Sequence, residues 1–171
     1  LMSKHTNNVL LTSNAKNGTE RISKNLDKIP KKYNIIVNIQ ADEPFIDHRN
    51  IDYAIEKHIE NINEDIFYTT LHEESNNYKY IKSTSSLKVV IDKNNKALFY
   101  SRNVIPFNKE GSIDKSKKYN LFTGIYVFNR LYLEKYHELE NTPLQISEDC
   151  EQLKIIEHGY TIKSFPSPNP N

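Results

Sequence analysis

The sequence predicts an α/β fold with a mixed, mostly parallel sheet that is interrupted by one inserted β-hairpin. Short apolar runs rich in β-branched residues alternate with segments of helical periodicity along most of the 171 residues. The run Ile35-Ile36-Val37 is apolar on both faces, as in a strand that lies between two layers of helices. A polar connector at 92–96 joins two extended runs directly, which indicates a hairpin.

The N-terminal half contains three predicted strands and two predicted helices. The first helix ends at Pro30, because proline cannot continue a helix. The second carries apolar residues at helical spacing between Ile51 and Ile59. In chain order the expected elements are a strand at 8–12, a helix at 19–29, a strand at 34–40, a helix at 50–62 and a strand at 67–72.

The C-terminal half begins with the hairpin and ends with two helices and a strand. Ser147 is the predicted N-cap of the last helix, where Glu148 and Asp149 suit the helix dipole, and Gly159 ends that helix. Thr142-Pro143 is expected to start a connector. The expected elements are hairpin strands at 87–91 and 97–100, a surface loop at 108–118, a strand at 121–128, a helix through 131–139, a helix at 147–158 and a strand at 160–165.

Length and composition predict a single domain over residues 1–171, since a chain of this length buries one core. The 23 Lys and Arg nearly balance the 22 Asp and Glu, so no overall field favours nucleic acid. The only cysteine, Cys150, excludes an internal disulfide and a multi-cysteine zinc site and fits a reducing, cytoplasmic compartment. No apolar run approaches the roughly 18 residues that span a bilayer, so no membrane partner is expected.

The residues that follow the strand at 34–40 form the first candidate site. Gln40, Asp42 and Glu43 arrive where the strand ends, and Pro44 blocks its continuation. Ligands of open α/β sheets bind beyond the carboxyl ends of strands, so Asp42 is placed to hold a hard cation such as Mg²⁺ beside a phosphate. The alternatives are that Asp42 caps the next helix, that Glu43 pairs with a lysine and that Gln40 satisfies the core.

Four segments together resemble one enzyme family. The run NIQADEPFI at 38–46 is similar to the signature of 3-deoxy-manno-octulosonate (Kdo) cytidylyltransferases, in which the Asp binds Mg²⁺ and the Gln lies at the substrate. The runs NGTERIS at 17–23, ALFYSRNVIPF at 97–107 and EQLKIIEHGYTI at 151–162 resemble the same family in the same order. The resemblance implies a Rossmann-like nucleotide-diphospho-sugar transferase fold, Mg²⁺ as cofactor, CTP and a keto-acid sugar as substrates, and a homodimer.

Two of these segments supply candidate nucleotide and carboxylate contacts. Gly18 and Thr19 join a strand to a helix, where exposed backbone amides admit a phosphate or a base. The resemblance implies that Arg21 contacts the nucleotide, whereas an arginine in a first helical turn is otherwise solvated. Ser101-Arg102 ends the hairpin, and its guanidinium suits the carboxylate of a sugar acid; the alternative is an ion pair with a nearby Glu or Asp. Together with Asp42, Arg102 is a predicted catalytic residue.

The remaining candidates are expected to bind the sugar. Tyr126 follows Gly124 on a predicted strand, and Glu151-Gln152 opens the EQLK segment, which gives the mixed donors and acceptors that a polyhydroxy acid requires. Tyr126 alone would be interpreted as a core residue. Phe122 stands two residues before the glycine, where the resembling family commonly has His, and this leaves the identity of the sugar open.

The resembling family also contains two motifs that are absent between Leu1 and Asn171. These are the loop P-A-R-x-x-S-x-R-L-P-G-K, which cradles the CTP triphosphate, and the segment D-T-x-E-D, which supplies a second metal carboxylate. We therefore expect a fragment of a longer enzyme, inactive by itself, or a degenerate copy. The leading hypothesis is formation of CMP-Kdo and pyrophosphate for lipopolysaccharide or related polysaccharide synthesis. The alternatives are a cytidylyltransferase for another keto-acid sugar, such as a sialic-acid-like sugar, and a non-catalytic sugar- or nucleotide-binding remnant.

The predicted hairpin at 87–102 is the candidate dimerisation region. Leu87, Val89 and Ile91 alternate with polar residues, so one strand has a single apolar face. We expect a second subunit to cover that face. On this hypothesis Val89→Lys shifts a dimer toward monomer.

Overall fold

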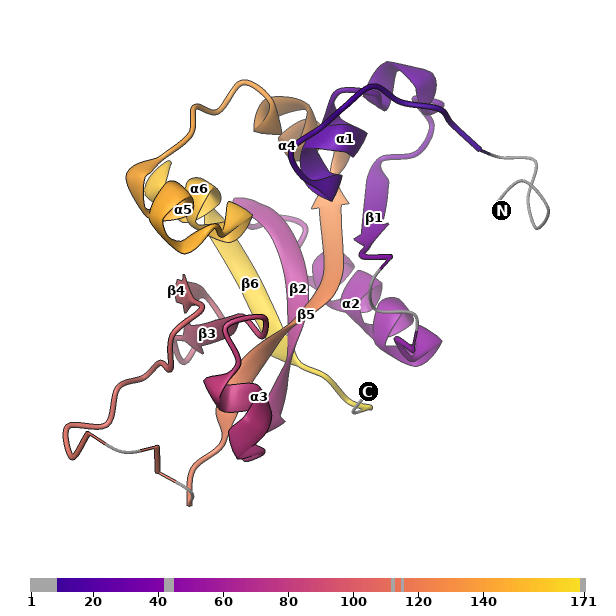
Figure 1. The fold of residues 1–171 in the computed structure, drawn as a ribbon. Helices are drawn as coiled ribbons and strands as arrows, with labels where there is room; N and C mark the ends of the chain where they lie inside the picture. The colour runs from indigo at the N-terminus through magenta and orange to yellow at the C-terminus, as the bar shows by residue number, and fades with distance from the viewer. Residues whose placement is uncertain (1–8, 42–44, 112, 115, 170–171) are drawn as a thin grey trace.

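The longest strand, β5 (Tyr119–Asn129), lies at the centre of the sheet because it is apolar on both faces. Tyr126 and Phe128 belong to one hydrophobic core, and Ile125 and Val127 belong to a second core on the opposite face. The computed structural model describes residues 9–41, 45–111, 113–114 and 116–169. Over these residues a six-stranded sheet lies between two layers of helices (Figure 1).

The hydrogen-bonded strand pairs are mostly antiparallel. Strands β1 (Ile35–Ile39), β2 (Ile66–Ser75) and β3 (Lys88–Ile91) all pair antiparallel with β5, and β3 pairs antiparallel with β4 (Ala97–Ser101). Among the described residues only β2 and β6 (Thr161–Pro166) form a parallel pair. The mixed α/β sheet is confirmed, but the expectation of a mostly parallel sheet is wrong.

The reason for this difference lies in the position of β5. Strands β1 and β2 run in the same direction, as the helical connection between them predicts, but both pair with β5, which lies between them and runs the opposite way. The chain leaves β2, forms the β3–β4 hairpin and returns antiparallel as β5. The hairpin therefore reverses the chain direction at the centre of the sheet.

Two strands share one edge of β5 and leave a gap between them. Ile39 at the end of β1 faces Ile125, and the amide of Gln40 donates to the carbonyl of Gly124 at 3.0 Å. Lys88 at the start of β3 faces Leu121 on the same edge. Strand β1 thus ends on one side of Thr123 and β3 begins on the other side, along the same edge of β5. Ligands of α/β proteins bind at comparable points, where neighbouring strands diverge.

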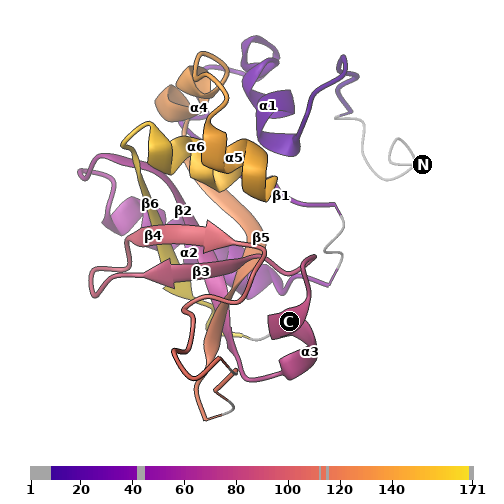
Figure 2. The same ribbon diagram turned by 60° about the vertical axis from the view of Figure 1, so that its left-hand side comes forward.

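The helices cover the two faces of the sheet unequally. Helix α2 (His48–Glu60) packs through Ala54 on the core that contains Ile125. The other core receives Leu133 from α4 (Arg130–Tyr136) and Leu153 from α6 (Glu151–Glu157), and α6 also contacts the hairpin (Figure 2). The remaining helices are α1 (Gly18–Ser23), the 3₁₀ turn η2 (Leu26–Lys28), α3 (Tyr78–Lys82) and α5 (Pro143–Glu148).

Three element predictions need correction. Residues 9–12 form no strand, and Leu11 is 88% exposed, because no strand pairs with this apolar run within the described part of the chain. The helix expected at 19–29 divides into α1 and η2. The last helix is also divided: Thr142-Pro143 starts α5, since proline suits a first helical position, and Ser147 lies inside α5 instead of capping α6.

The apolar face of β3 packs inside its own chain. Val89 is 1% exposed and belongs to the core that contains Tyr126 and Phe128. The prediction that a second subunit covers Val89 is therefore wrong, because Val89 already packs in the core that contains Leu153 and Ile155 of α6. Leu98 on β4 is 53% exposed and is the apolar hairpin side chain that faces outward.

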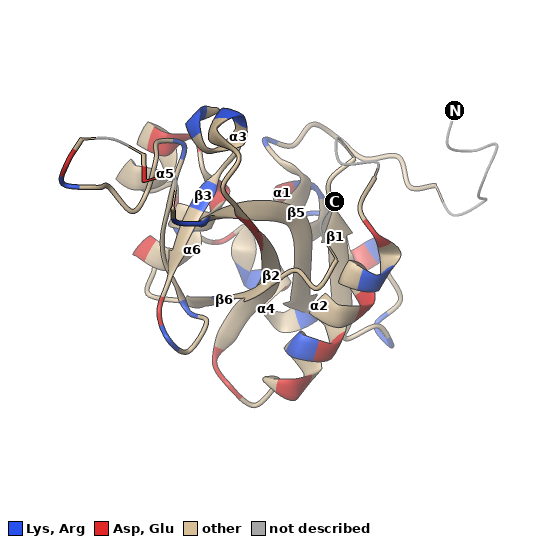
Figure 3. Cartoon of the chain, turned by 90° about the horizontal axis from the view of Figure 1, so that it is seen from below, with Lys and Arg blue, Asp and Glu red and all other residues tan. Residues whose placement is uncertain are grey.

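Charged residues of both signs are interspersed over the surface. In the view from below, Lys and Arg alternate with Asp and Glu along helices and loops, while the strands at the centre of the sheet carry few charges (Figure 3). This distribution agrees with the near balance of 23 basic and 22 acidic residues. None of the helices in the described ranges is both long and apolar enough to cross a bilayer.

Candidate active site

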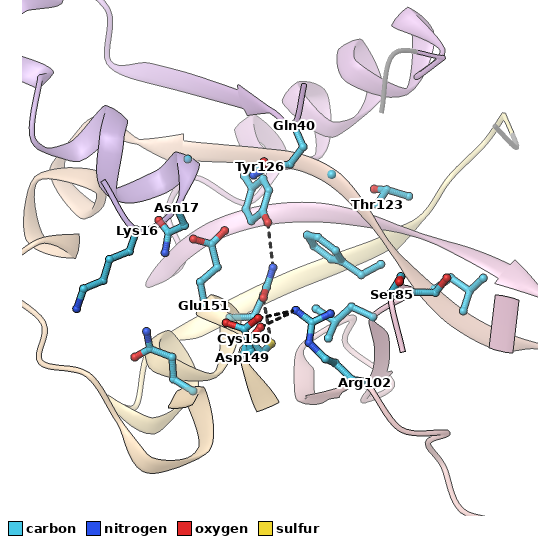
Figure 4. A pocket seen from close by; sticks show the side chains of 18 of the residues that line it. Lys16, Asn17, Gln40, Ser85, Arg102, Thr123, Tyr126, Asp149, Cys150 and Glu151 are labelled. Carbon is cyan, nitrogen blue, oxygen red and sulfur yellow. Dashed lines mark hydrogen bonds and ion pairs between the residues drawn. The ribbon is translucent and has the colours of Figure 1, made fainter. Parts of the chain in front are cut away.

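A cavity of about 860 Å³ opens where β1 and β3 separate along β5. Its volume lies within the range of small-molecule sites. The wall is formed by the loop before α1, the end of β1, the loop before β3, the middle of β5 and the segment between α5 and α6 (Figure 4). Segments more than 130 residues apart in the chain thus meet at one site, as the 132-residue separation between Thr19 and its partner Glu151 illustrates.

Six of the predicted site residues line this cavity, whereas Thr19, Arg21 and Ser101 do not. Thr19 and Ser101 are buried behind the wall, and Arg21 is exposed. Asp42, the predicted metal ligand, lies outside the described residues, as do Glu43 and Pro44. The six lining residues are Gly18, Gln40, Arg102, Tyr126, Glu151 and Gln152.

The loop before α1 lies close to the end of β1 at Gly18. A Cβ at Gly18 would lie 3.4 Å from both Asn38 Nδ2 and Gln40 Nε2. Asn17 caps α1, since its side-chain oxygen accepts from the amide of Glu20 at 2.7 Å. Gly18 and Gln40 thus lie side by side at the cavity wall.

Glu151 is the central carboxylate of the cavity. Thr19 Oγ1 and the Tyr136 hydroxyl each donate to it at 3.3 Å, and Asn17 Nδ2 donates to the Tyr136 oxygen at 3.1 Å. Burial raises the pKa of the Glu151 carboxyl, and hydrogen bonds from Tyr126, Thr19 and Tyr136 offset part of that increase. The site thus combines a carboxylate that resists ionisation with hydroxyl donors directed at it.

The raised pKa of Glu151 predicts a pH-dependent difference between the wild-type chain and Glu151→Gln. In the unfolded chain the carboxyl ionises near its ordinary value of 4.5, whereas in the folded chain it ionises at a higher pH. The contribution of Glu151 to stability is therefore fully present below pH 4.5 and is lost as the pH rises through the folded pKa. We expect thermal unfolding to show the wild type losing stability relative to Glu151→Gln from pH 4.5 upward. A constant difference from pH 4 to 8 would contradict this.

Gln152 connects Tyr126 with Cys150. The Gln152 amide nitrogen donates to the Tyr126 hydroxyl at 3.0 Å, and the Cys150 thiol donates to the Gln152 carbonyl oxygen at 3.0 Å (Figure 4). Burial raises the pKa of the Cys150 thiol to about 12 and also raises the pKa of Tyr126. Both groups therefore carry their protons at neutral pH.

Arg102 lines the cavity but already has several partners. Its guanidinium donates to the backbone carbonyls of Glu148, Thr84 and Asp149 at 2.8 to 3.0 Å and pairs with the Asp149 carboxylate at 3.4 Å. The adjacent Ser101 hydroxyl donates to a Glu148 carboxylate oxygen at 2.8 Å. The ion pair that was the alternative for Arg102 is thus present, and the same contacts hold the guanidinium at the cavity wall.

Arg21 points away from the cavity. Its guanidinium donates to Thr12 Oγ1 at 2.8 Å and to the carbonyl of Ser13 at 3.2 Å. These contacts attach the extended segment before α1 to the helix. The position of Arg21 gives no support to the predicted nucleotide contact.

One wall of the cavity is apolar. It is formed by Leu87, Leu121 and Phe122, and the Phe122 ring packs edge-on against Tyr100 and Tyr126 at centroid distances of 5.8 and 5.3 Å. The Phe122 ring offers neither a strong donor nor a strong acceptor. Polar groups from the α1 loop, α6 and the neighbouring positions of β5 line the rest of the cavity.

The described residues do not by themselves make a metal site. Within 9–41, 45–111, 113–114 and 116–169, no three His, Cys, Asp or Glu side chains come together in an arrangement that would hold a metal ion. The N-cap of α2 is Asp47, whose carboxylate accepts from the amide of Arg49 at 2.8 Å. The helix-capping role considered for Asp42 thus belongs to Asp47.

Comparison with known proteins identifies the family. Residues 2–163 match the family described as cytidylyltransferase, which is most of the chain. The chain belongs to the cytidylyltransferase family. It is 39% identical over 159 residues to the mitochondrial 3-deoxy-manno-octulosonate cytidylyltransferase of Arabidopsis thaliana, covering 91% of this chain and 53% of the plant protein. It is 38% identical over 156 residues to the corresponding enzyme of Fusobacterium nucleatum subsp. nucleatum, covering 91% and 61%. The chain therefore spans about half the length of the relatives it matches.

A solved structure of the family has the same fold. It is a CMP:2-keto-3-deoxy-manno-octonic acid synthetase complexed with CTP, and it superposes with a TM-score of 0.80 at 26% identity over 92% of this chain and 62% of that one. The nucleotidyltransferase fold expected from the sequence resemblance is thus confirmed.

Several cavity residues of this cytidylyltransferase chain were not predicted. Asn17 had a usable signal, because Asn followed three residues later by Glu before an apolar position resembles a helix start. The others come from loops, helices and strands whose contact with the site depends on tertiary packing. They include Lys16, Glu73, Tyr80, Ser85, Thr123, Asn141, Gln145 and Asp149.

Proposed function

We propose that the protein to which this chain belongs transfers CMP from CTP to Kdo, releasing pyrophosphate. One observation carries the proposal: the four sequence segments that resemble Kdo cytidylyltransferases converge on a single cavity through Gly18, Gln40, Arg102 and Glu151. The relatives named for that activity, and the related structure complexed with CTP, support the same reaction.

In this reaction a sugar hydroxyl oxygen bonds to the α-phosphorus of CTP while the bond to the β-phosphate oxygen breaks. The hydroxyl proton leaves, and the β- and γ-phosphates depart as pyrophosphate. Such a transfer depends on in-line positioning and charge neutralisation more than on covalent chemistry by the protein. We assign the sugar hydroxyls to Glu151, Gln152 and Tyr126, the sugar carboxylate to Arg102, and the substrate edge near β1 to Gln40 and Gly18.

We propose that Asp42 contributes to binding Mg²⁺, which would neutralise phosphate charge when bound. Asp42 follows the cavity residue Gln40 by two positions in the sequence. An oxygen ligand on an anionic side chain suits this hard cation. The described residues contribute no complete ligand set for this ion.

The proposal is tested by nucleotide specificity in the full-length protein. We expect pyrophosphate release that requires both CTP and Kdo, together with a CMP-sugar product detected by mass spectrometry. Release from ATP or UTP at the same rate as from CTP would contradict the cytidylyltransferase assignment. Binding of CTP or Kdo without turnover would favour the non-catalytic remnant.

A second candidate substrate is favoured by the apolar wall. Phe122 lies between Tyr100 and Tyr126 at the cavity, so one side of the sugar meets a hydrocarbon surface. Another keto-acid sugar could present a less polar face there. Parallel assays with Kdo and N-acetylneuraminate distinguish the two, and a higher kcat/KM for N-acetylneuraminate would favour the second candidate.

We also propose that the full-length protein is a homodimer, on the basis of the family resemblance. Leu98, which is 53% exposed on β4, replaces Val89 as the hairpin residue to test. Leu98→Lys is expected to shift the population toward monomer in sedimentation equilibrium, whereas Leu98→Met should leave it unchanged. A monomeric wild type at micromolar concentration would contradict the dimer.

We further propose a cytoplasmic location, which the single cysteine favours. The Arabidopsis relative is named as mitochondrial, so the two compartments are the alternatives to compare. Fractionation of cells that express the full-length protein tests this. Recovery in an organelle or membrane fraction would contradict the proposal.

A further inference from the structure

Two buried hydrogen bonds link Cys150, Gln152 and Tyr126 at the cavity wall. Their exposed fractions are 3%, 3% and 4%, so the groups cannot exchange these bonds freely with solvent. Cys150 is the N-cap residue of α6, yet its side chain makes no capping hydrogen bond. Instead the thiol lies 3.0 Å from Gln152 Oε1, and Gln152 Nε2 lies 3.0 Å from the Tyr126 oxygen.

The thiol determines which group donates in each of these two hydrogen bonds. A protonated thiol donates, so the carbonyl end of the Gln152 amide is the end that faces Cys150. The NH₂ end must then face Tyr126 and donate to its oxygen. The Tyr126 proton is left to donate elsewhere, and the Glu151 carboxyl is the partner that faces it.

We propose that Cys150 is a positioning residue that fixes the orientation of the Gln152 amide and thereby makes Tyr126 a proton donor toward Glu151 and the bound sugar. Without the thiol the amide can turn, so that its oxygen accepts the Tyr126 proton. That proton is then unavailable to a ligand. The inference rests on the proposed sugar-binding role of Tyr126 and Glu151.

Packing is a competing role for Cys150, because it also belongs to the core that contains Leu153 and Tyr100. Valine and serine separate the two roles. Cys150→Val keeps an apolar group in the same space but removes the donor. Cys150→Ser keeps a donor on the same backbone atom and reduces the apolar contact.

The hydrogen bond itself can be observed without any ligand or variant. Because Cys150 is the only cysteine, the infrared spectrum of the chain contains a single S–H stretching band. We expect this band at the lower frequency of a hydrogen-bonded thiol, and we expect Gln152→Leu to move it to higher frequency. A band at the position of a thiol without an acceptor, or no change in Gln152→Leu, would overturn the proposal.

Sugar binding then tests the consequence. Titration of full-length protein with Kdo should give a Kd roughly two- to tenfold weaker in Cys150→Val, the range expected for one lost hydrogen bond, and a Kd near the wild-type value in Cys150→Ser. Equal weakening in both variants, or none in Cys150→Val, would overturn the positioning role. Absence of Kdo binding by the wild type would contradict the proposed function, while the infrared result would still decide whether Cys150 orients Gln152.

Discussion

Replacing Lys88 with Met is expected to lower the free energy of unfolding by about 3 kcal/mol or more. Lys88 is fully buried, and its ammonium donates to the carbonyls of Ser83, Ser86 and Arg102. A carbonyl left without a donor costs about 1–3 kcal/mol when buried, and these three bonds are part-buried. Methionine has a similar length but no donor, so three acceptors lose their partner together.

Removing a buried charge also relieves a desolvation cost, which opposes this loss. Burial lowers the pKa of Lys88, in line with such a cost, and the positive charge of the nearby Arg102 lowers that pKa further. We expect the loss to dominate, because three carbonyls depend on one ammonium. Hydrogen exchange should therefore quicken at residues 83–87, which include cavity-lining positions.

Lys93→Met is the matched control for this experiment. Lys93 is exposed at the tip of the same hairpin, so the substitution should change the free energy of unfolding by less than about 0.5 kcal/mol. Chemical denaturation of the two variants gives the comparison. If Lys88→Met unfolds no earlier than Lys93→Met, the three carbonyls do not depend on the ammonium.

Asp42→Asn in the full-length protein is expected to lower the rate of CMP-sugar formation by about 100-fold or more while leaving the melting temperature unchanged. A neutral amide binds Mg²⁺ weakly, so transition-state charge on the phosphates stays unbalanced. Helix capping does not explain such a loss, because α2 is capped by Asp47.

Asp47→Asn provides the control for the second prediction. It makes the same chemical change five residues further along the sequence, and asparagine caps a helix as well as aspartate does. We expect steady-state kinetics to give the wild-type rate for Asp47→Asn. Wild-type turnover in Asp42→Asn, or an equal loss in both variants, would contradict the metal-binding role.

Local sequence patterns determined most of the elements. The β-branched run at Ile35-Ile36-Val37 became β1, and the apolar spacing from Ile51 to Ile59 became α2. The polar connector at 92–96 became the turn of a hairpin. These predictions succeeded because a strand, a helix and a tight turn each depend on neighbours within a few residues. The family resemblance likewise selected six residues that line one cavity.

Tertiary structure decided which strands became neighbours and which way side chains faced. Residues 9–12 resemble a strand locally, yet no strand within the described ranges pairs with them. Val89 belongs to a run in which apolar and polar residues alternate, as in a surface strand, but its side chain packs inward. Arg21 follows the family motif and still turns toward Thr12. The missing strand at 9–12 and the inward packing of Val89 depend on partners that lie far away in the chain, and periodicity carries no information about them.

The cavity itself depends on one such long-range choice. Strand β5 lies between β1 and β2. Gln40 and Leu87 then bond to the same edge of β5 on either side of Thr123. The sequence determined which residues are candidates for the site. Only the pairing of β5 with both strands brought them to one place, because hydrogen bonds between distant strands are set by the burial of the whole sheet and not by any local pattern.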